Sequence, residues 1–204
     1  MKSGRRILCD PCGSSSAEFA LVLPILILFL LGTIDIGRYM WSINKLEKAT
    51  QAGARMAVVT SLVPAGLGQD YSATLGQGSP IPFGEAKCNK PAGSVSCSCV
   101  TSPCPTLTPV DNTATGPFNK IVGRMNLIAP MINTNGSNVT INYKNSGLGY
   151  AGDPSGPDLA PIVTVSVAGV PFTPLIFQFF GAQTTLPKVS ASLTLEDGQG
   201  NSSN

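Results

Sequence analysis

The sequence predicts an α+β protein in which one long N-terminal helix precedes a small antiparallel sheet in a loop-rich C-terminal part. The first observation is an uncharged apolar run at residues 19–34, followed by helical periodicity to about residue 61. The second is a set of three strand-like runs after residue 137, in a part of the chain rich in Gly and Pro. A chain of 204 residues has room for one domain and an appendage.

The composition excludes several classes of function. Charged residues make up 12% of the chain, against about 25% in average soluble domains, and the formal net charge is +2. The chain has no histidine, which excludes Ser-His-Asp and Cys-His catalysis and histidine metal ligands. Lys and Arg do not cluster as nucleic-acid binding requires, and no nucleotide-binding, hydrolase or zinc-protease motif occurs. We therefore expect no enzyme activity, no cofactor, no metal site and no nucleic-acid partner.

The apolar run at residues 19–34 predicts a transmembrane helix. Its helical length is about 24 Å against a hydrocarbon core of about 30 Å, and continuation to Trp41 closes the gap. Asp35 and Arg38 are three residues apart on this helix and can pair, while the Arg38 guanidinium can reach the headgroups. Pro24 lies inside the run, where membrane helices tolerate proline. We expect a single span at about residues 19–41, in contact with membrane lipid.

The charges before the apolar run predict its orientation. Three basic residues and one acidic residue precede Glu18, so the positive-inside rule places the N-terminus in the cytoplasm and the residues after about 41 outside. A cleaved secretory signal is the alternative. It fits poorly, because the apolar run is longer than a typical signal core and no Ala-x-Ala site follows it.

A carboxylate stands at the junction before the run. Residues 13–18 read GSSSAE and lead directly into FALVLP at residues 19–24. Such a charge at the edge of a bilayer span is costly unless it meets a cation or hydrogen-bond donors. Cleavage after Gly13 would free an α-amino group on Ser14 and make Glu18 the fifth residue of the mature chain. This arrangement resembles the processing site of type IV pilin precursors; the alternative is an interfacial carboxylate that only ends the span.

Residues 13 to about 57 are similar to the TadE-like family of minor pilins, which is associated with the biogenesis of Flp (tight adherence) pili. The matching elements are Gly13, the core Glu18-Phe19-Ala20-Leu21, Pro24, Gly32, Asp35, Gly37 and Ala52-Gly53-Ala54-Arg55. The resemblance implies a pilin-like fold. It divides the chain into a leader at residues 1–13, a helix at residues 14–61 and an extracytoplasmic head at residues 62–204.

The resemblance also implies a function and partners. A membrane-embedded prepilin peptidase is expected to cleave between Gly13 and Ser14, and Glu18 is expected to meet the N-terminal amine of a neighbouring subunit during assembly. The implied partners are other pilus subunits and the pilus assembly machinery at the bacterial inner membrane. Incorporation into the filament and a scaffold role in the membrane both stay open. The alternative function is a signal-anchored extracytoplasmic binding or scaffold domain unrelated to pili.

An apolar stripe continues along the helix beyond the apolar run. It comprises Ile36, Tyr39, Ile43, Leu46, Thr50, Gly53 and Ala57, with Lys45, Lys48, Gln51 and Arg55 on other faces. The stripe is expected to pack on the protein's own sheet, and packing against another helix in a filament is the alternative. Pro64 and the glycines at 66 and 68 predict that the helix ends near residues 61–63.

The Pro- and Gly-rich stretch of the head contains four cysteines: Cys88, Cys97, Cys99 and Cys104. Outside the cytoplasm they predict two disulfides, and a four-thiolate zinc site is the alternative, which the absence of paired C-x-x-C motifs disfavours. Pairing of Cys97 with Cys99 is disfavoured because alternate positions point apart. Cys88 is expected to pair with Cys97 or Cys104.

Three later runs, at residues 138–144, 161–170 and 189–196, predict strands of a small antiparallel sheet with one face on the long helix. Residues 117–132 have a weak helical period. Residues 170–180 hold four of the eight phenylalanines, at positions 172, 177, 179 and 180. This aromatic segment is expected to belong to the core of the head, and a membrane-proximal or subunit-contact patch is the alternative.

Overall fold

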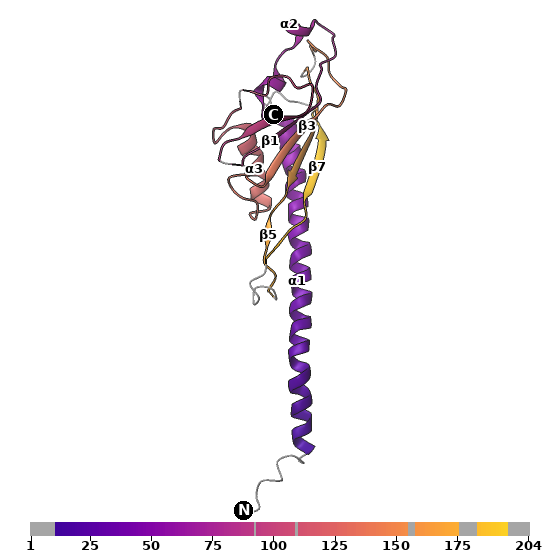
Figure 1. The fold of residues 1–204 in the computed structure, drawn as a ribbon, viewed down its shortest axis with the longest axis vertical. Helices are drawn as coiled ribbons and strands as arrows, with labels where there is room; N and C mark the ends of the chain where they lie inside the picture. Colours follow the sequence, from indigo (N-terminus) through magenta and orange to yellow (C-terminus); the bar gives the residue numbers. More distant parts are fainter. Residues whose placement is uncertain (1–10, 92, 109, 155–157, 176–182, 196–204) are drawn as a thin grey trace, which may run out of the picture. The chain divides into compact units, whose positions relative to one another are not determined.

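The structure is a computed structural model that describes residues 11–91, 93–108, 110–154, 158–175 and 183–195, with only the backbone described for residues 11–14. It confirms the α+β class: a long N-terminal helix is followed by a small antiparallel sheet (Figure 1). The fold divides into two compact units. The first contains Met1–Trp41 and Pro171–Thr184, and the second contains Ser42–Val170 and Thr185–Asn204.

Helix α1 (Pro11–Val59) contains 49 residues and runs through Pro24. It ends slightly before the predicted boundary near residues 61–63, although Thr60 still donates its backbone N–H to the carbonyl of Met56. Pro64 disfavours helical geometry in the residue before it, so the helix cannot continue past that point. A 3-10 turn, η1 (Ala65–Gly68), and the short helix α2 (Ser72–Leu75) follow.

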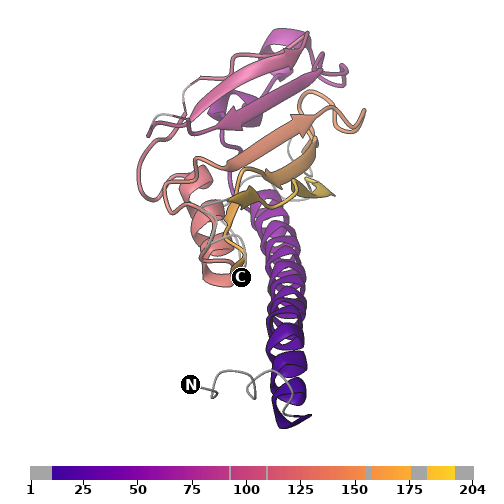
Figure 2. The same cartoon turned by 60° about the horizontal axis from the view of Figure 1, so that its bottom comes forward.

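The second unit contains a five-stranded sheet in which every neighbouring pair is antiparallel (Figure 2). Its spatial order is β2-β1-β3-β4-β7. The strands are β1 (Glu85–Asn89), β2 (Ser96–Thr101), β3 (Val139–Lys144), β4 (Ile162–Val167) and β7 (Val189–Thr194). Two short strands, β5 (Pro171–Phe172) and β6 (Thr184–Thr185), form a separate ribbon.

The three predicted strand runs are confirmed as β3, β4 and β7. The hairpin of β1 and β2 was not predicted, because its sequences, EAKCN and SCSCVT, are small and polar and lack the apolar alternation that identifies strands. The hairpin extends the sheet through an in-register pairing of β1 with β3.

Helix α3 (Pro117–Ile128) confirms the predicted helical segment and covers the core of the second unit. Gly116 is its N-cap and Pro117 its first residue, where a missing N–H costs nothing. The helix buries Phe118, Ile121, Val122 and Met125, the spacing of one helix face. Together with buried side chains of the second half of α1 and the inward positions of β3 and β4, they form the apolar core.

Candidate functional site

The first half of α1 presents its apolar side chains outward. Only 6% of its most apolar 18-residue window is buried, and Leu21 and Phe29 are 75% and 71% exposed. A core helix of a soluble domain would bury such side chains. Within the described part of the chain, α1 is the one helix long and apolar enough to cross a membrane. It is therefore typical of a single-pass membrane anchor.

The predicted processing and assembly residues lie at the start of α1. Gly13 and Ser14 belong to its first turn, and Glu18 follows one turn later, exposed, directly before Phe19. In the uncut chain the nitrogen of Ser14 is part of a peptide bond, so the predicted amine partner of Glu18 exists only after cleavage. The first four N–H groups of a helix have no partners within it, so this turn unwinds more easily than the helix interior.

Asp35 stands where the uncharged run ends, and it is 8% exposed. Its Oδ1 accepts a hydrogen bond of 2.8 Å from the backbone N–H of Leu175 and lies 3.3 Å from Nη1 of Arg38. The predicted pair of Asp35 and Arg38 is thus present. A buried carboxylate at the end of an apolar span is costly unless it is paired and hydrogen-bonded. The contacts with Leu175 and Arg38 supply a hydrogen bond and an ion pair.

The same part of α1 also contacts Phe172 of β5. The Phe172 ring packs edge-on against Tyr39, with centroids 5.4 Å apart, and the Arg38 guanidinium lies 5.7 Å from the Phe172 centroid. Both contacts are internal to the first unit. Phe172 is buried, as expected for a core residue, and its observed ring contacts are with α1 in the first unit. The phenylalanines at 177, 179 and 180 lie outside the described residues.

A nearly apolar cavity of about 360 Å³ adjoins this cluster in the first unit. It is lined by Gly32, Asp35, Ile36, Tyr39, Phe172, Pro174 and Thr184. The contact between Asp35 and Leu175 joins residues 140 positions apart, so no local sequence pattern could have indicated it. The signal available in the sequence was the carboxylate itself, placed at the end of an uncharged run.

The Ala52-Gly53-Ala54-Arg55 segment is the place where α1 approaches α3 and the sheet. A Cβ atom built on Gly53 would lie 2.7 Å from Sδ of Met125 and 3.3 Å from Cγ1 of Val165. Ala54 is fully buried, whereas Arg55 is exposed. A residue without a side chain is needed at position 53 because Met125 of α3 and Val165 of β4 occupy the space that a side chain would take. The apolar stripe from Leu46 onward therefore packs within the second unit, as expected.

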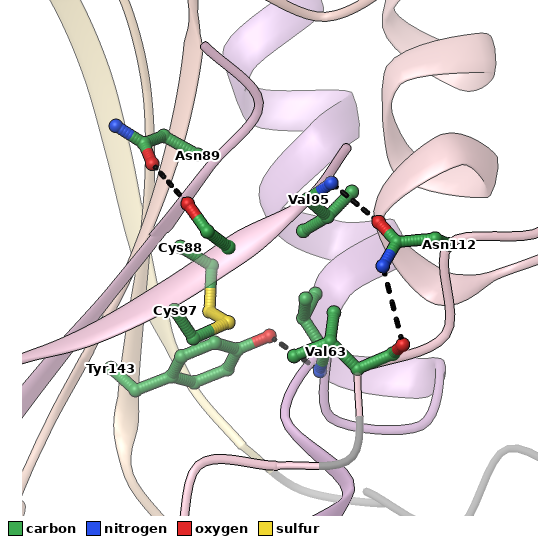
Figure 3. The surroundings of a disulfide bond; sticks show 9 residues. Val63, Cys88, Asn89, Val95, Cys97, Asn112 and Tyr143 are labelled. Atoms are coloured by element: carbon green, nitrogen blue, oxygen red, sulfur yellow. Dashed lines mark hydrogen bonds between the residues drawn. A yellow bond between two sulfur atoms is a disulfide. The ribbon is translucent and has the colours of Figure 1, made fainter. Parts of the chain in front are cut away.

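The four cysteines of the head lie in two pairs at bonding distance. Cys88 and Cys97 are directly opposite each other on β1 and β2, with Cα atoms 4.1 Å apart (Figure 3). Cys99 pairs with Cys104, with Cα atoms 5.9 Å apart. Of the two partners expected for Cys88, Cys97 is thus the one observed. All four sulfurs are used in these pairs, which leaves no thiolates for the alternative zinc site.

Tyr143 of β3 lies beside the Cys88–Cys97 pair in Figure 3 and is fully buried. Its hydroxyl oxygen accepts a hydrogen bond of 3.2 Å from the backbone N–H of Val63, which connects β3 to the chain just after α1. Burial raises the pKa of the Tyr143 phenol far above its ordinary value, because an ionised phenolate would be desolvated there. The side chain is therefore a neutral structural group.

The start of the chain resembles a known family. Residues 13–55 match the family model described as TadE-like protein. This confirms the resemblance inferred from the sequence and covers about a fifth of the 204 residues. The matched segment includes Gly13, Glu18, Asp35 and the close-approach residue Gly53. No curated protein and no solved structure matched the chain.

Proposed function

We propose that the protein is a membrane-anchored, minor pilin-like subunit required for the assembly of Flp-type (tight adherence) pili. In this proposal a prepilin peptidase cuts between Gly13 and Ser14, and the mature chain spans the bacterial inner membrane once, with its N-terminus facing the cytoplasm and its head outside. Its partners are then other pilus subunits and the assembly machinery. The observation that carries the proposal is the TadE-like match, which begins at Gly13 and runs to Arg55.

The arrangement of the matched segment supports this proposal. The outward-facing apolar side chains of α1 suit a bilayer, and Glu18 precedes them at the edge of the run. Cleavage after Gly13 would put the new amine and Glu18 about one helical turn apart in sequence, so the amine of one chain could meet the carboxylate of a neighbour. The TadE-like family is associated with pili as a structural family, which favours assembly over catalysis.

Cleavage is the first test. The full chain is expressed with and without a prepilin peptidase in an otherwise identical host, and its N-terminus is read by sequencing and intact mass. The expected product in the presence of the peptidase starts at Ser14, and the Gly13→Leu variant should stay uncut. A wild-type chain that stays uncut beside an active peptidase contradicts the processing step and favours a signal-anchored domain unrelated to pili.

The role of Glu18 is tested by a matched pair of variants. Glu18→Ala and Glu47→Ala each remove one exposed glutamate from α1. Pilus number per cell is counted by electron microscopy in a strain whose own copy has been replaced. We expect Glu18→Ala to abolish or strongly reduce piliation while cleavage persists, and Glu47→Ala to leave it unchanged. Normal piliation with Glu18→Ala would contradict the assembly role.

A further inference from the structure

A groove with an apolar floor lies between the second half of α1 and α3, entirely within the second unit. Its volume is about 570 Å³. Its apolar lining, called the floor below, consists of Ala52, Met56 and Val59 from α1 and Ile128 from α3, and the polar side chain of Gln51 also lines it. Val59 is 45% exposed, so solvent reaches the apolar surface. This is a different face of α1 from the one that packs against Met125 and the sheet.

Three cations surround this floor: Lys48 and Arg55 on α1 and Arg124 on α3. All three side chains are exposed. In the described ranges none of them forms an ion pair with a carboxylate. Lys48 and Arg55 are seven residues apart, which places them two turns apart on one helix face, separated by about 10 Å. The groove thus combines apolar surface with positive charge along its length.

We propose that this groove binds an acidic amphipathic helix of a partner protein. An apolar groove between helices is a common seat for the apolar face of a third helix, whose anchors recur at steps of three and four residues. Carboxylates two turns apart on such a helix match the separation of Lys48 and Arg55. Arg124 faces the partner from the other wall. Charge complementarity of this kind fixes the orientation of the partner and speeds encounter.

An anionic membrane surface fits the groove less well. A bilayer surface is flat and offers phosphates, but it has no apolar side chain to fill a recess of about 570 Å³. Single phosphates would satisfy the cations and leave Met56, Val59 and Ile128 in water. The proposal does not depend on pilus assembly, because it rests only on the geometry of the second unit.

The test uses the full chain reconstituted in nanodiscs of neutral phosphatidylcholine. The probe is a fluorescent synthetic 16-residue peptide with leucines on one helix face and glutamates beside them, and fluorescence anisotropy reports its binding. The comparison variants are Arg55→Glu/Arg124→Glu and the matched control Lys87→Glu/Lys188→Glu, which changes the net charge equally at exposed positions outside the groove. Circular dichroism confirms that each variant keeps its secondary structure.

We expect the groove variant to weaken peptide binding about tenfold and the control to change it less than twofold. A peptide with lysines in place of the glutamates should bind the groove variant better than the wild type, which is the charge-swap result that only direct contact produces. A shuffled peptide with no apolar face should bind weakly. Equal binding to both variants, or equal binding of the shuffled peptide, would overturn the proposal. So would groove-dependent binding of phosphatidylglycerol vesicles in the absence of peptide binding, which would assign the groove to lipid.

Discussion

A methyl group added at Gly53 should disturb the contact between α1 and α3. Its Cβ would lie 2.7 Å and 2.8 Å from Sδ and Cγ of Met125, a side chain with no exposed surface. Overpacking of this kind costs about 1–3 kcal/mol. Replacing glycine by alanine inside a helix returns about 1 kcal/mol through helix propensity. We therefore expect Gly53→Ala to change the free energy of unfolding by about 0–2 kcal/mol in the destabilising direction.

The matched control is Gly123→Ala in α3, where a Cβ atom would meet nothing within 4 Å. This variant should be stabilised by up to about 1 kcal/mol, because only the propensity gain applies. The difference between the two variants isolates the overpacking cost. Urea unfolding of the second unit is followed by pulse proteolysis of the full chain in detergent. With a slope of about 2 kcal/mol per molar urea, the two midpoints should differ by about 0.5–1.5 M.

A double-mutant cycle with Met125 makes the reasoning refutable. Met125→Ala alone should cost about 2–5 kcal/mol by leaving a cavity. In that background the two Met125 atoms that a Cβ of Gly53 would strike are gone, and Val165 Cγ1 at 3.3 Å remains the nearest neighbour. Gly53→Ala should then become close to neutral or stabilising. The coupling energy should equal the overpacking cost of about 1–3 kcal/mol. If Gly53→Ala is as stabilising as Gly123→Ala, or if the effects at 53 and 125 simply add, the two helices do not meet at Gly53.

Three further predictions concern the other contacts. Asp35→Ala should speed amide exchange at Leu175 about tenfold or more, as measured by hydrogen-exchange NMR, because that N–H loses a charged acceptor; Asp35→Asn keeps an acceptor oxygen and should have a smaller effect. Replacing Cys99 and Cys104 by serine should lower the stability of the second unit by about 2 kcal/mol, and an unchanged urea midpoint would show that they are not bonded. Burial raises the pKa of Tyr143 in the folded protein above the value of about 10 in the unfolded chain, so above pH 10 only the unfolded state ionises there. The contribution of this group to the free energy of unfolding is therefore full below pH 10 and falls as the pH rises further, by about 1.4 kcal/mol at pH 11. Tyr143→Phe should remove this part of the loss between pH 9 and 11.

The sequence indicated the elements whose signal is local. The strands β3, β4 and β7 alternate apolar residues, and α3 begins with a proline at its first position. The β1–β2 hairpin has no such signal. It exists because Cys88 faces Cys97 across the hairpin and because Ile141 of β3 offers the other edge of β1 a partner. Tertiary pairing, rather than propensity, decides the fold of these two strands.

The candidate sites depended on long-range contacts in the same way. The sequence indicated that Asp35 needs a partner and named Arg38, but Leu175 reaches this carboxylate only through the returning chain. The periodicity puts Lys48 and Arg55 on faces of the helix that the apolar stripe does not use. Arg124 is the third cation around the groove between α1 and α3, and it comes from a helix with only a weak period in the sequence. Periodicity assigns a face to a residue, and only the fold shows what lies opposite that face.

Two physical demands explain most of the TadE-like segment, and Glu18 is explained by neither. Exposed apolar residues such as Phe29 suit contact with a bilayer, and Gly53 leaves room for the Met125 side chain of α3. Glu18 is exposed and precedes the apolar run, where a neutral residue would serve an anchor equally well. The helix dipole stabilises a carboxylate in the first turn by about 0.3–1 kcal/mol, and Glu18 lies beyond that turn of α1, so the dipole contributes too little to decide assembly. If Glu18 matters only through the helix dipole, cells with the Glu18→Asp variant should carry as many pili as the wild type. If Glu18 pairs with the amine of a neighbouring chain, the length of its side chain matters as well as its charge. Glu18→Asp should then give fewer pili than the wild type, and Glu18→Gln should give none.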